Sequence, residues 1–437
     1  MKVKQSRWKM FVVAGAAMAF VAGMVSTVPN VYAGGTIKGD DDKWISIGMG
    51  TRTSFSMRED GSGSGGQWSN SFGVDNARIY INGKIHKYVG FEFNTECFNC
   101  PRSGQLAGGP NSNTFGSNSG VGMLDVIGKF EITELVNVWF GRMLVPTERG
   151  ELNGPFYHAV YDGFRTPLNP ADFSTNFGAG GAGMYGRDNG VTFFGKIHPG
   201  GTHLQYVAGV FTGTQSSLAT ATGGGPNQRN SLKYAGRLTW NLLNEEKNPG
   251  YYTSGTYYGT AGDILALAVG GEYQNTAAGS ALNPAPFGAF VSDILFEKVL
   301  ENKGVITVNA EYKRYWAGNL ASFSDATAGT PTSTFFPIFS GTSFTTYAMY
   351  LFPQEVGIGR FQPYGRYTFV NSVHASALDE FEGGVNYVIA GHNARISTFW
   401  RHGNIAPTGG PAQSGFISTG IGAPHQDSFH VALQLQY

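Results

Sequence analysis

The sequence predicts an all-β protein, a transmembrane antiparallel β-barrel of about 16 strands, and three observations support this class. Short segments of alternating apolar and polar residues run from residue 44 to the last residue. Many of them reach about ten residues, the length that a tilted strand needs to cross a bilayer. Short and long connections alternate between them. After residue 33 we find neither sustained 3.6-residue periodicity nor an apolar run long enough to span a membrane as a helix.

The first 33 residues have the pattern of a cleaved secretory signal peptide. Four basic side chains precede an apolar run at residues 10–25, and the small residues at 31–33 offer a cleavage site before Gly34. The alternative is an uncleaved anchor helix, but the apolar run is shorter than the roughly 20 residues that a membrane span needs. We therefore expect a signal peptide at 1–33 and one barrel domain at 34–437.

The domain at 34–437 carries 26 basic and 30 acidic side chains, a net charge of about −4. This balance offers no basic surface for nucleic acid, so outer-membrane lipid and small solutes are the expected partners. With 14% charged residues, 14% aromatic residues and 64 glycines, the composition is also unlike that of a two-domain soluble enzyme of this length.

Alternation with a period of two defines the individual strands, and the last strand shows it best. From Phe429 to Tyr437 the odd positions are apolar, whereas Ser428 and Gln434 stand on even positions. Successive side chains of a strand point to opposite faces, so one face of this segment is apolar and the other is mainly polar. The same pattern places sixteen strands near residues 44–56, 75–86, 88–96, 123–132, 135–144, 187–198, 202–212, 231–242, 263–274, 286–298, 304–316, 343–352, 360–370, 379–389, 392–402 and 426–437.

The lengths of the connections distinguish a barrel from a soluble β-sandwich, whose strands also alternate. Short turns at one rim, long loops at the other and an even number of strands are typical of outer-membrane barrels, and lipid requires that such a sheet closes. The link at 243–262 departs from this pattern because it is too long for a tight turn, which points to a misplaced strand boundary. Links after even-numbered strands are mostly short, and those after odd-numbered strands are mostly long, at 57–74, 97–122, 145–186, 213–230, 317–342 and 403–425.

Four patches of the chain carry a resemblance to a known family. They are "VWFGRMLVPTERGEL" (138–152), "GRDNGVTFFGKI" (186–197), "RFQPYGRYTFV" (360–370) and "DEFEGGVNYVIAGHNARISTFWR" (379–401). In these patches and in its terminal aromatic residue, Tyr437, the chain resembles the phosphate-selective porin O/P family of the bacterial outer membrane. The resemblance implies sixteen strands, a homotrimer and a pore that is narrowed by an inward-folded third extracellular loop.

The connection at 145–186 has the composition expected of such a loop. It is the longest connection, it follows the fifth strand, and its first half contains prolines and aromatic residues such as Phe156, Tyr161 and Phe164. A loop that lies on the barrel wall would bury these rings, whereas a solvated loop tip would expose them. The alternative is an ordinary packed surface loop.

The expected function is that of a porin, a water-filled channel for passive diffusion of small hydrophilic solutes and ions, with inorganic anions or phosphate as candidate solutes. Anion selectivity needs fixed positive groups at the constriction. Several arginines are candidates for such groups. Acidic residues such as Glu92, Glu311 and Glu382 also lie near strands, so we expect any one of these arginines to be a wall residue paired with a carboxylate. The pore candidates are Arg142, Arg149, Arg165, Arg187, Arg395 and Arg401, with Lys84 and Lys313 on the polar faces of their strands.

No motif in the sequence indicates catalysis or a cofactor. Neither G-x-S-x-G nor H-E-x-x-H occurs, and the nine histidines are scattered singly. Covalently attached haem would need C-x-x-C-H, but Pro101 follows Cys100. We therefore predict no enzyme and no cofactor. A barrel that serves as the scaffold or sheath of an outer-membrane redox or adhesion complex is the alternative function.

The two cysteines of the chain, Cys97 and Cys100, form a C-x-x-C motif at the start of the expected second extracellular loop. Two cysteines at this spacing in an exported chain most often oxidise to a local disulfide. A zinc site would need two more ligands, and no second C-x-x-C or nearby histidine supplies them. The Cys97–Cys100 disulfide is the prediction, with a surface metal site or redox activity as the alternatives.

Overall fold

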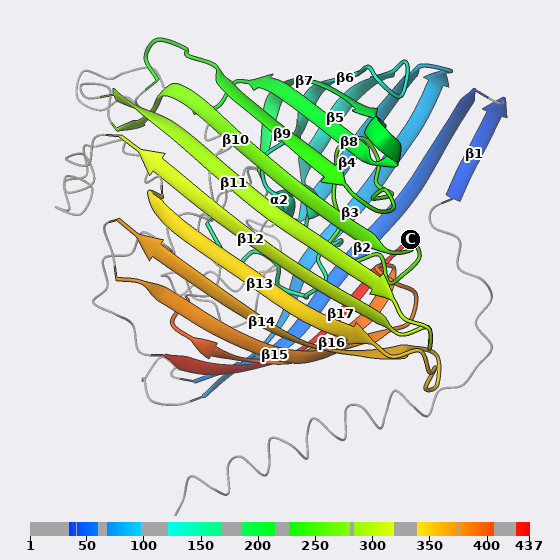
Figure 1. The fold of residues 1–437 in the computed structure, drawn as a ribbon, viewed down its shortest axis with the longest axis vertical. Coiled ribbons are helices and arrows are strands. Elements are labelled where there is room, and N and C mark those ends of the chain that lie inside the picture. The colour runs from blue at the N-terminus through cyan, green and yellow to red at the C-terminus, as the bar shows by residue number, and fades with distance from the viewer. Residues whose placement is uncertain are drawn as a thin grey trace, which may run out of the picture.

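The structure is a computed structural model that describes residues 35–40, 42–59, 68–97, 121–167, 186–214, 227–279, 284–318, 339–373, 376–405 and 425–437. Its strands form one antiparallel sheet that closes into a barrel (Figure 1). The strands are β1 (Gly35–Asp40), β2 (Lys43–Arg58), β3 (Ser69–His86), β4 (Val89–Cys97), β5 (Val121–Glu131), β6 (Asn137–Leu144), β7 (Arg187–Ile197), β8 (His203–Phe211), β9 (Lys233–Asn241), β10 (Ile264–Gly279), β11 (Pro284–Val299), β12 (Val305–Ala317), β13 (Gly341–Leu351), β14 (Arg360–Ser372), β15 (Leu378–Val388), β16 (Ala394–Gly403) and β17 (Gln426–Gln436).

The barrel is a ring of sixteen strands, from β2 to β17, in which neighbours in the chain are also neighbours in the sheet. The ring closes where β17 pairs with β2, and there Ala432 lies opposite Ser54. Because each strand of the ring has two partners, its backbone groups are bonded without help from water, as a lipid environment requires. The predicted number and order of strands are confirmed. The short strand β1, which pairs with the start of β2, was not predicted.

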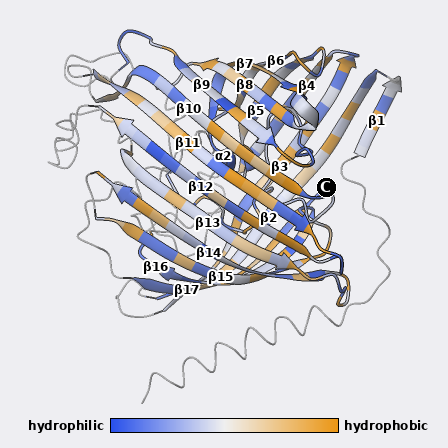
Figure 2. Ribbon diagram, in the orientation of Figure 1, coloured by the Kyte–Doolittle hydropathy of each residue, from blue (hydrophilic) through white to orange (hydrophobic). Residues whose placement is uncertain are grey.

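The barrel is apolar on its outer face and polar on its inner face. In β17, Leu435 is 42% exposed while its neighbour Gln434 is completely buried. In β16, Trp400 is 39% exposed while Arg395 is completely buried. Figure 2 shows the resulting change between hydrophobic and hydrophilic residues along the strands. The apolar faces expected from the sequence therefore point outward, and the polar faces point into the lumen.

The two ends of the barrel differ in their connections. The C-terminal residue and the start of β2 lie at the end with the short turns, and the link between β9 and β10 is the long connection at this end. The sequence pointed to a misplaced boundary in this link, but β9 ends at Asn241 and β10 begins at Ile264, so the long link is real. The short turns comprise residues 87–88, 132–136, 198–202 (with the 3-10 helix η2, Pro199–Gly201), 300–304, 352–359 and 389–393.

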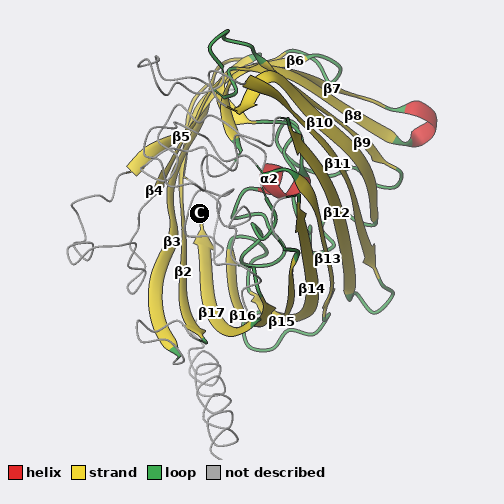
Figure 3. Cartoon of the chain, turned by 90° about the vertical axis from the view of Figure 1, so that its left-hand side faces the viewer, coloured by secondary structure: helices red, strands yellow, loops and turns green. Residues whose placement is uncertain are grey.

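Two connections lie inside the ring of strands. Residues 145–167, between β6 and β7, include the short helix α2 (Arg149–Asn153), which Figure 3 shows within the ring. Residues 242–263 enter from the opposite end. The predicted signal peptide, Cys100 and residues 168–185 of the predicted third loop lie outside the described residues. No helix in the described part of the chain is both long and apolar enough to cross a membrane.

The closed ring predicts that a disulfide can join its first and last strands. Ser54 and Ala432 are direct partners, and partners in antiparallel strands have Cα atoms about 4.5–5.5 Å apart, within the range of a disulfide. We expect the double variant Ser54→Cys/Ala432→Cys to oxidise readily, as measured by non-reducing electrophoresis and peptide mapping. The pair Ser54→Cys/Thr345→Cys, on strands that are not neighbours, is the control. Equal cross-linking of the two pairs would contradict the closed register.

Candidate functional site

The candidate site is the lumen of the barrel, where two segments of chain lie against the polar wall. The third-loop segment (residues 145–167) follows β6, and the β9–β10 segment (residues 242–263) enters from the other end. Neither segment forms a strand, so its buried backbone groups need partners other than a β-ladder. Side chains of the wall supply many of these partners.

Side chains of β16 and β17 hold the third-loop segment by its carbonyl groups. Arg395 donates hydrogen bonds to the carbonyl oxygens of His158 and Ala159, each at 2.9 Å. Gln434 donates to the carbonyl oxygen of Phe156, also at 2.9 Å. These donors stand at inward positions of neighbouring strands, so they form a row that follows the segment. The row replaces the hydrogen bonds that water would otherwise provide.

A buried ion network fixes α2 in the lumen. Arg149 donates from Nε to Asp293 at 2.7 Å, and its two terminal nitrogens donate to the two carboxylate oxygens of Glu246, each at 2.8 Å. Arg237 of β9 donates to the same Asp293 at 2.6 and 2.9 Å. Because Asp293 belongs to β11 and Glu246 to the β9–β10 segment, Arg149 joins both inner segments to the wall. Loss of one partner from such a network leaves an uncompensated charge, at a cost of about 3–5 kcal/mol.

The two inner segments also bind each other directly. The amide of Gly255 donates to the carbonyl oxygen of Tyr157 at 2.8 Å, and the hydroxyl of Thr253 donates to the side-chain oxygen of Asn153 at 2.8 Å. The contact at Gly255 is close, because a Cβ at this position would lie 2.5 Å from the amide nitrogen of Ala159. The segments therefore form one interlocked unit in the lumen.

Glu297 of β11 fixes the turn of the β9–β10 segment to the wall. Its carboxylate accepts hydrogen bonds from the amide of Tyr257 at 3.0 Å, the amide of Gly259 at 2.7 Å and the hydroxyl of Thr256 at 2.8 Å. Hydrogen bonds to a charged acceptor are stronger than neutral ones. This buried carboxylate thus has a structural task and is not free to bind a solute.

Two carboxylates near the start of α2 are buried close together. Glu148 forms an ion pair with Lys313 of β12 and accepts a hydrogen bond from Tyr315 at 2.8 Å. Burial raises the pKa of Glu148, although the attraction of Lys313 acts in the opposite direction. Burial, with the repulsion of Glu148, raises the pKa of Glu151 well above its usual value. These carboxyl groups therefore retain protons at a higher pH than exposed ones do.

Most of the pore arginines predicted from the sequence are buried in the lumen, where they bind the wall or the inner segments. Arg165 donates to Glu380 at 2.9 Å. Arg187 donates to both carboxylate oxygens of Asp125, at 2.9 and 3.3 Å. Such pairing is what we expected of wall residues. The buried members of the set are Arg149, Arg165, Arg187, Arg395 and Arg401.

Arg401 lies inside the barrel, whereas Arg142 stands on an outward position of its strand. Arg401 donates to Glu382 at 2.5 Å and lies 3.0 Å from Asp162, so it joins β15 to the third-loop segment. Arg142 is the register partner of Val126, which is 40% exposed on the outer face. Direct partners in a sheet share a face. The structure therefore does not bring Arg142 together with the other five arginines.

The sequence reasoning missed several basic residues of the lumen. Arg52 donates to the carbonyl oxygen of Tyr161, and Arg366 donates to that of Asp162 at 2.6 Å. Both arginines stand on the inward face of their strands, and this parity was the signal that could have identified them. Of the two predicted lysines, Lys313 binds Glu148 as described above, and Lys84 pairs with Glu131 at 3.6 Å.

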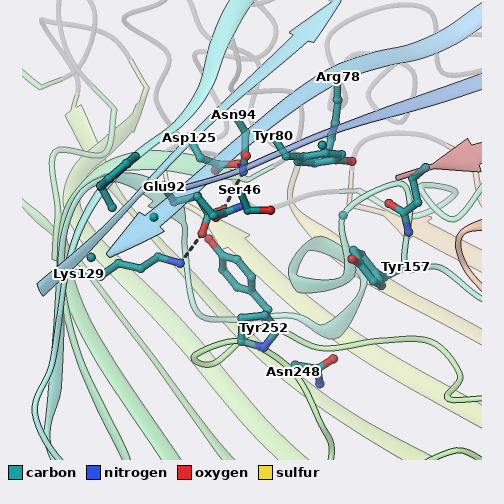
Figure 4. A pocket seen from close by; sticks show the side chains of 18 of the residues that line it. Ser46, Arg78, Tyr80, Glu92, Asn94, Asp125, Lys129, Tyr157, Asn248 and Tyr252 are labelled. Atoms are coloured by element: carbon teal, nitrogen blue, oxygen red, sulfur yellow. Dashed lines mark hydrogen bonds and ion pairs between the residues drawn. The ribbon is translucent and has the colours of Figure 1, made fainter. Parts of the chain in front are cut away.

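A cavity of about 760 Å³ lies between the inner segments and the wall formed by β2–β5 (Figure 4). Ser46, Asn94 and Lys129 line it on the wall side, and Asn248 and Tyr252 line it on the side of the β9–β10 segment. It is a space beside the interlocked segments that is lined by both polar and apolar surface and is large enough for a small solute. Among the described residues, no group of three or more His, Cys, Asp or Glu side chains is placed to bind a metal.

Solved structures of other proteins share this fold. No family model and no curated protein sequence matches the chain. OmpF of Salmonella typhi, solved in complex with daunomycin, is similar with a TM-score of 0.52 and 11% identity over 92% of this chain and 100% of that one. An anion-selective porin of Comamonas acidovorans is similar with a TM-score of 0.50 and 12% identity over 90% and 100%. At these identities the likeness establishes the fold, that of an outer-membrane β-barrel.

Two histidines, the buried His158 and the half-buried His392, predict a contribution to the binding of the inner segments that weakens in acid. Burial and the Arg395 guanidinium lower the pKa of His392, in the turn before β16, to about 3. Burial and the Arg52 guanidinium likewise lower the pKa of His158. Histidine has an ordinary pKa of 6.5. Below this pH, a histidine that becomes exposed to water when the segments detach binds a proton, whereas the same histidine in the folded lumen does not. The contribution of these histidines to the free energy that holds the segments is therefore complete above about pH 6.5 and decreases as the pH falls towards 3, whereas the raised pKa values of Glu148 and Glu151 act in the opposite direction.

Hydrogen exchange of the amides at 145–167 measures this free energy. The variant His392→Gln isolates the histidine contribution, because Glu148 and Glu151 are present in both proteins. We expect the stability difference between wild type and variant to decrease when the pH is lowered from about 7.5 to about 5. A difference that stays constant over this range would show that His392 does not titrate as its burial requires.

Proposed function

We propose that the protein is an outer-membrane porin, a water-filled channel for passive diffusion of small hydrophilic solutes and ions. The observation that carries the proposal is a closed barrel with an apolar exterior, a polar interior and a cavity of about 760 Å³ beside the inner segments. The exterior suits lipid, and the interior suits water. The fold shared with OmpF and with an anion-selective porin supports the same class of function.

The proposed channel is narrowed from both ends. The third-loop segment and the β9–β10 segment bind wall side chains mainly of β11 to β17, with further contacts to Arg52 of β2 and Asp75 of β3, and the cavity lies along β2–β5. We propose that the whole predicted third loop, residues 145–186, forms the constriction together with the β9–β10 segment. The supporting observation is that the two segments are interlocked through Arg149 and Gly255.

The proposed channel discriminates little between small ions. Most of the lumenal arginines predicted from the sequence are paired with carboxylates, so an anion would have to compete with these carboxylates for them. Inorganic anions and phosphate are therefore candidate solutes only by resemblance to the phosphate-selective porin O/P family, a relationship that rests on four sequence patches. The paired arginines are Arg149, Arg165, Arg187 and Arg401.

Further parts of the proposal rest on the sequence. We propose export by a cleaved signal peptide at 1–33, residence in the bacterial outer membrane as a homotrimer, a Cys97–Cys100 disulfide and no enzymatic activity. Cys97 is the last residue of β4, at the end of the barrel opposite the short turns. The alternative function, the scaffold or sheath of an outer-membrane redox or adhesion complex, needs the barrel but no conducting lumen.

Planar-bilayer recording of the purified full chain tests the channel. We expect discrete, stable conductance steps and a reversal potential close to zero in a gradient of potassium chloride, because the described lumenal charges are largely paired. Absence of conductance would contradict the porin and favour the scaffold. A strongly anion-selective reversal potential that phosphate suppresses at low concentration would contradict the weak ion preference.

A loop-replacement variant tests whether the β9–β10 segment limits the conductance. Replacing residues 245–261 by a short Gly-Ser turn removes Glu246 and the contacts of Gly255, so we expect the single-channel conductance to increase severalfold. The matched control carries the same replacement at residues 353–358, a turn at the same end of the barrel outside the β9–β10 segment. Unchanged conductance in the first variant would show that the β9–β10 segment does not narrow the path.

A further inference from the structure

The cavity along β2–β5 has a chemistry that points to a class of solute, and this inference rests on the proposed channel function. Its volume of about 760 Å³ is in the range of small-molecule sites. One side is the fixed wall of the barrel, and the other side is the interlocked pair of inner segments. Both sides therefore present side chains in defined positions to a passing solute.

The basic side chains around the cavity are compensated by acidic side chains of the wall. Lys129 forms an ion pair with Glu92, and Figure 4 shows both beside the cavity. A free anion that bound one of these cations would have to displace its carboxylate partner, which leaves that carboxylate uncompensated. Lys38, which also lines the cavity, is an exposed residue of β1 at its rim. The pairs are Arg78–Glu96 at 2.5 Å, Lys84–Glu131 at 3.6 Å, Lys129–Glu92 and Arg187–Asp125 at 2.9 Å.

Three uncharged polar groups in the cavity wall are buried and lack a hydrogen-bond partner within the described residues. They are the hydroxyls of Tyr80 and Tyr252 and the side-chain carbonyl oxygen of Asn94. The amide nitrogen of Asn94 donates to Glu92 at 2.7 Å and to Asp125 at 3.0 Å, which fixes the orientation of the carbonyl. Figure 4 shows the Tyr252 ring extending from the β9–β10 segment towards Glu92. Buried polar groups are normally satisfied, so this arrangement favours a solute that supplies both a donor and an acceptor.

Uncharged amides and aromatic rings make up much of the remaining lining of the cavity. Side-chain amides around the cavity present both donors and acceptors without net charge. Aromatic rings, among them Tyr80 and Tyr157, add rigid apolar surface that loses little conformational entropy on contact with a solute. Alternating hydroxyl groups and apolar C–H faces on one small molecule would match both kinds of surface. The amides belong to Asn82, Asn94, Asn153, Asn248, Asn393 and Gln436.

We propose that this passage takes small, uncharged, polyhydroxylated solutes of the size of a mono- or disaccharide, and that Tyr252 and Asn94 are specificity-determining contacts. Hydroxyl groups of the solute donate to the Asn94 carbonyl oxygen and exchange hydrogen bonds with the Tyr252 hydroxyl. The solute crosses without displacing any ion pair of the wall. Inorganic anions also enter the channel but gain no comparable set of contacts.

Block of the ion current by added solute tests this proposal in planar bilayers. Sucrose and glucose are the probes, inorganic phosphate is the charged comparison, and currents are corrected for the change in bulk conductivity. We expect saturable block by the sugars and none by phosphate at equal concentration. Tyr252→Phe removes a single oxygen atom and is expected to raise the half-blocking sugar concentration by roughly three- to tenfold, the effect of one net hydrogen bond. Tyr234→Phe is the matched control, because Tyr234 lies on the outer face of β9 with 56% exposure.

The outcomes separate this inference from the proposed function. Conductance without sugar block, or block by phosphate instead of sugar, overturns the solute class and leaves the channel intact. An unchanged half-blocking concentration in Tyr252→Phe, or an equal change in the Tyr234→Phe control, overturns the role of Tyr252. Absence of any conductance in the wild type overturns both the channel and the inference.

Discussion

The structure depends on one constraint: two irregular segments inside a closed barrel must find hydrogen-bond partners for their buried backbone groups. Side chains of the wall supply these partners. Arg395 donates hydrogen bonds to the carbonyl oxygens of His158 and Ala159, and Glu297 accepts hydrogen bonds from amides of the β9–β10 segment. Arg149 then joins both segments to Asp293 of the wall. The polar residues of the lumen that make these contacts therefore have a structural role first of all.

In the proposed channel, this use of the polar residues limits where a solute can pass. On the side of β11–β17 the wall is covered by the third-loop and β9–β10 segments, and its charges are paired with the segments or with each other. On the side of β2–β5 the wall borders the cavity, where basic side chains of the wall form ion pairs with carboxylates and where uncharged groups of Tyr252 and Asn94 lack a hydrogen-bond partner within the described residues. A channel built in this way would restrict solutes by size and by hydrogen bonding more than by charge.

The sequence predicted the sixteen strands because lipid and a polar lumen impose a period of two that can be counted directly. It missed β1, a six-residue strand with two glycines that continues the sheet only at the start of β2. The parity of a strand identified Arg395 and Arg401 as inward residues, but it was not used for Arg52 and Arg366, and it does not show what an arginine binds. Arg149 and Asp293 are 144 residues apart, and only the closed ring brings them together. The length of the link at 242–263 was visible in the sequence, but its inward course depends on contacts with Glu297 and Tyr157 that no local pattern encodes.

In the proposed channel, the passage follows β2–β5, and the inner segments shield the opposite wall. Reaction of introduced cysteines with a charged methanethiosulfonate reagent during current recording tests this arrangement most directly. Ser46 lines the cavity, whereas Ser397 is completely buried on β16 beside Asn386, which holds the third-loop segment. The wild-type chain corrects for Cys97 and Cys100. We expect the reagent to reduce the current of Ser46→Cys and to leave that of Ser397→Cys unchanged. A rapid loss of current in Ser397→Cys, with none in Ser46→Cys, would contradict this arrangement.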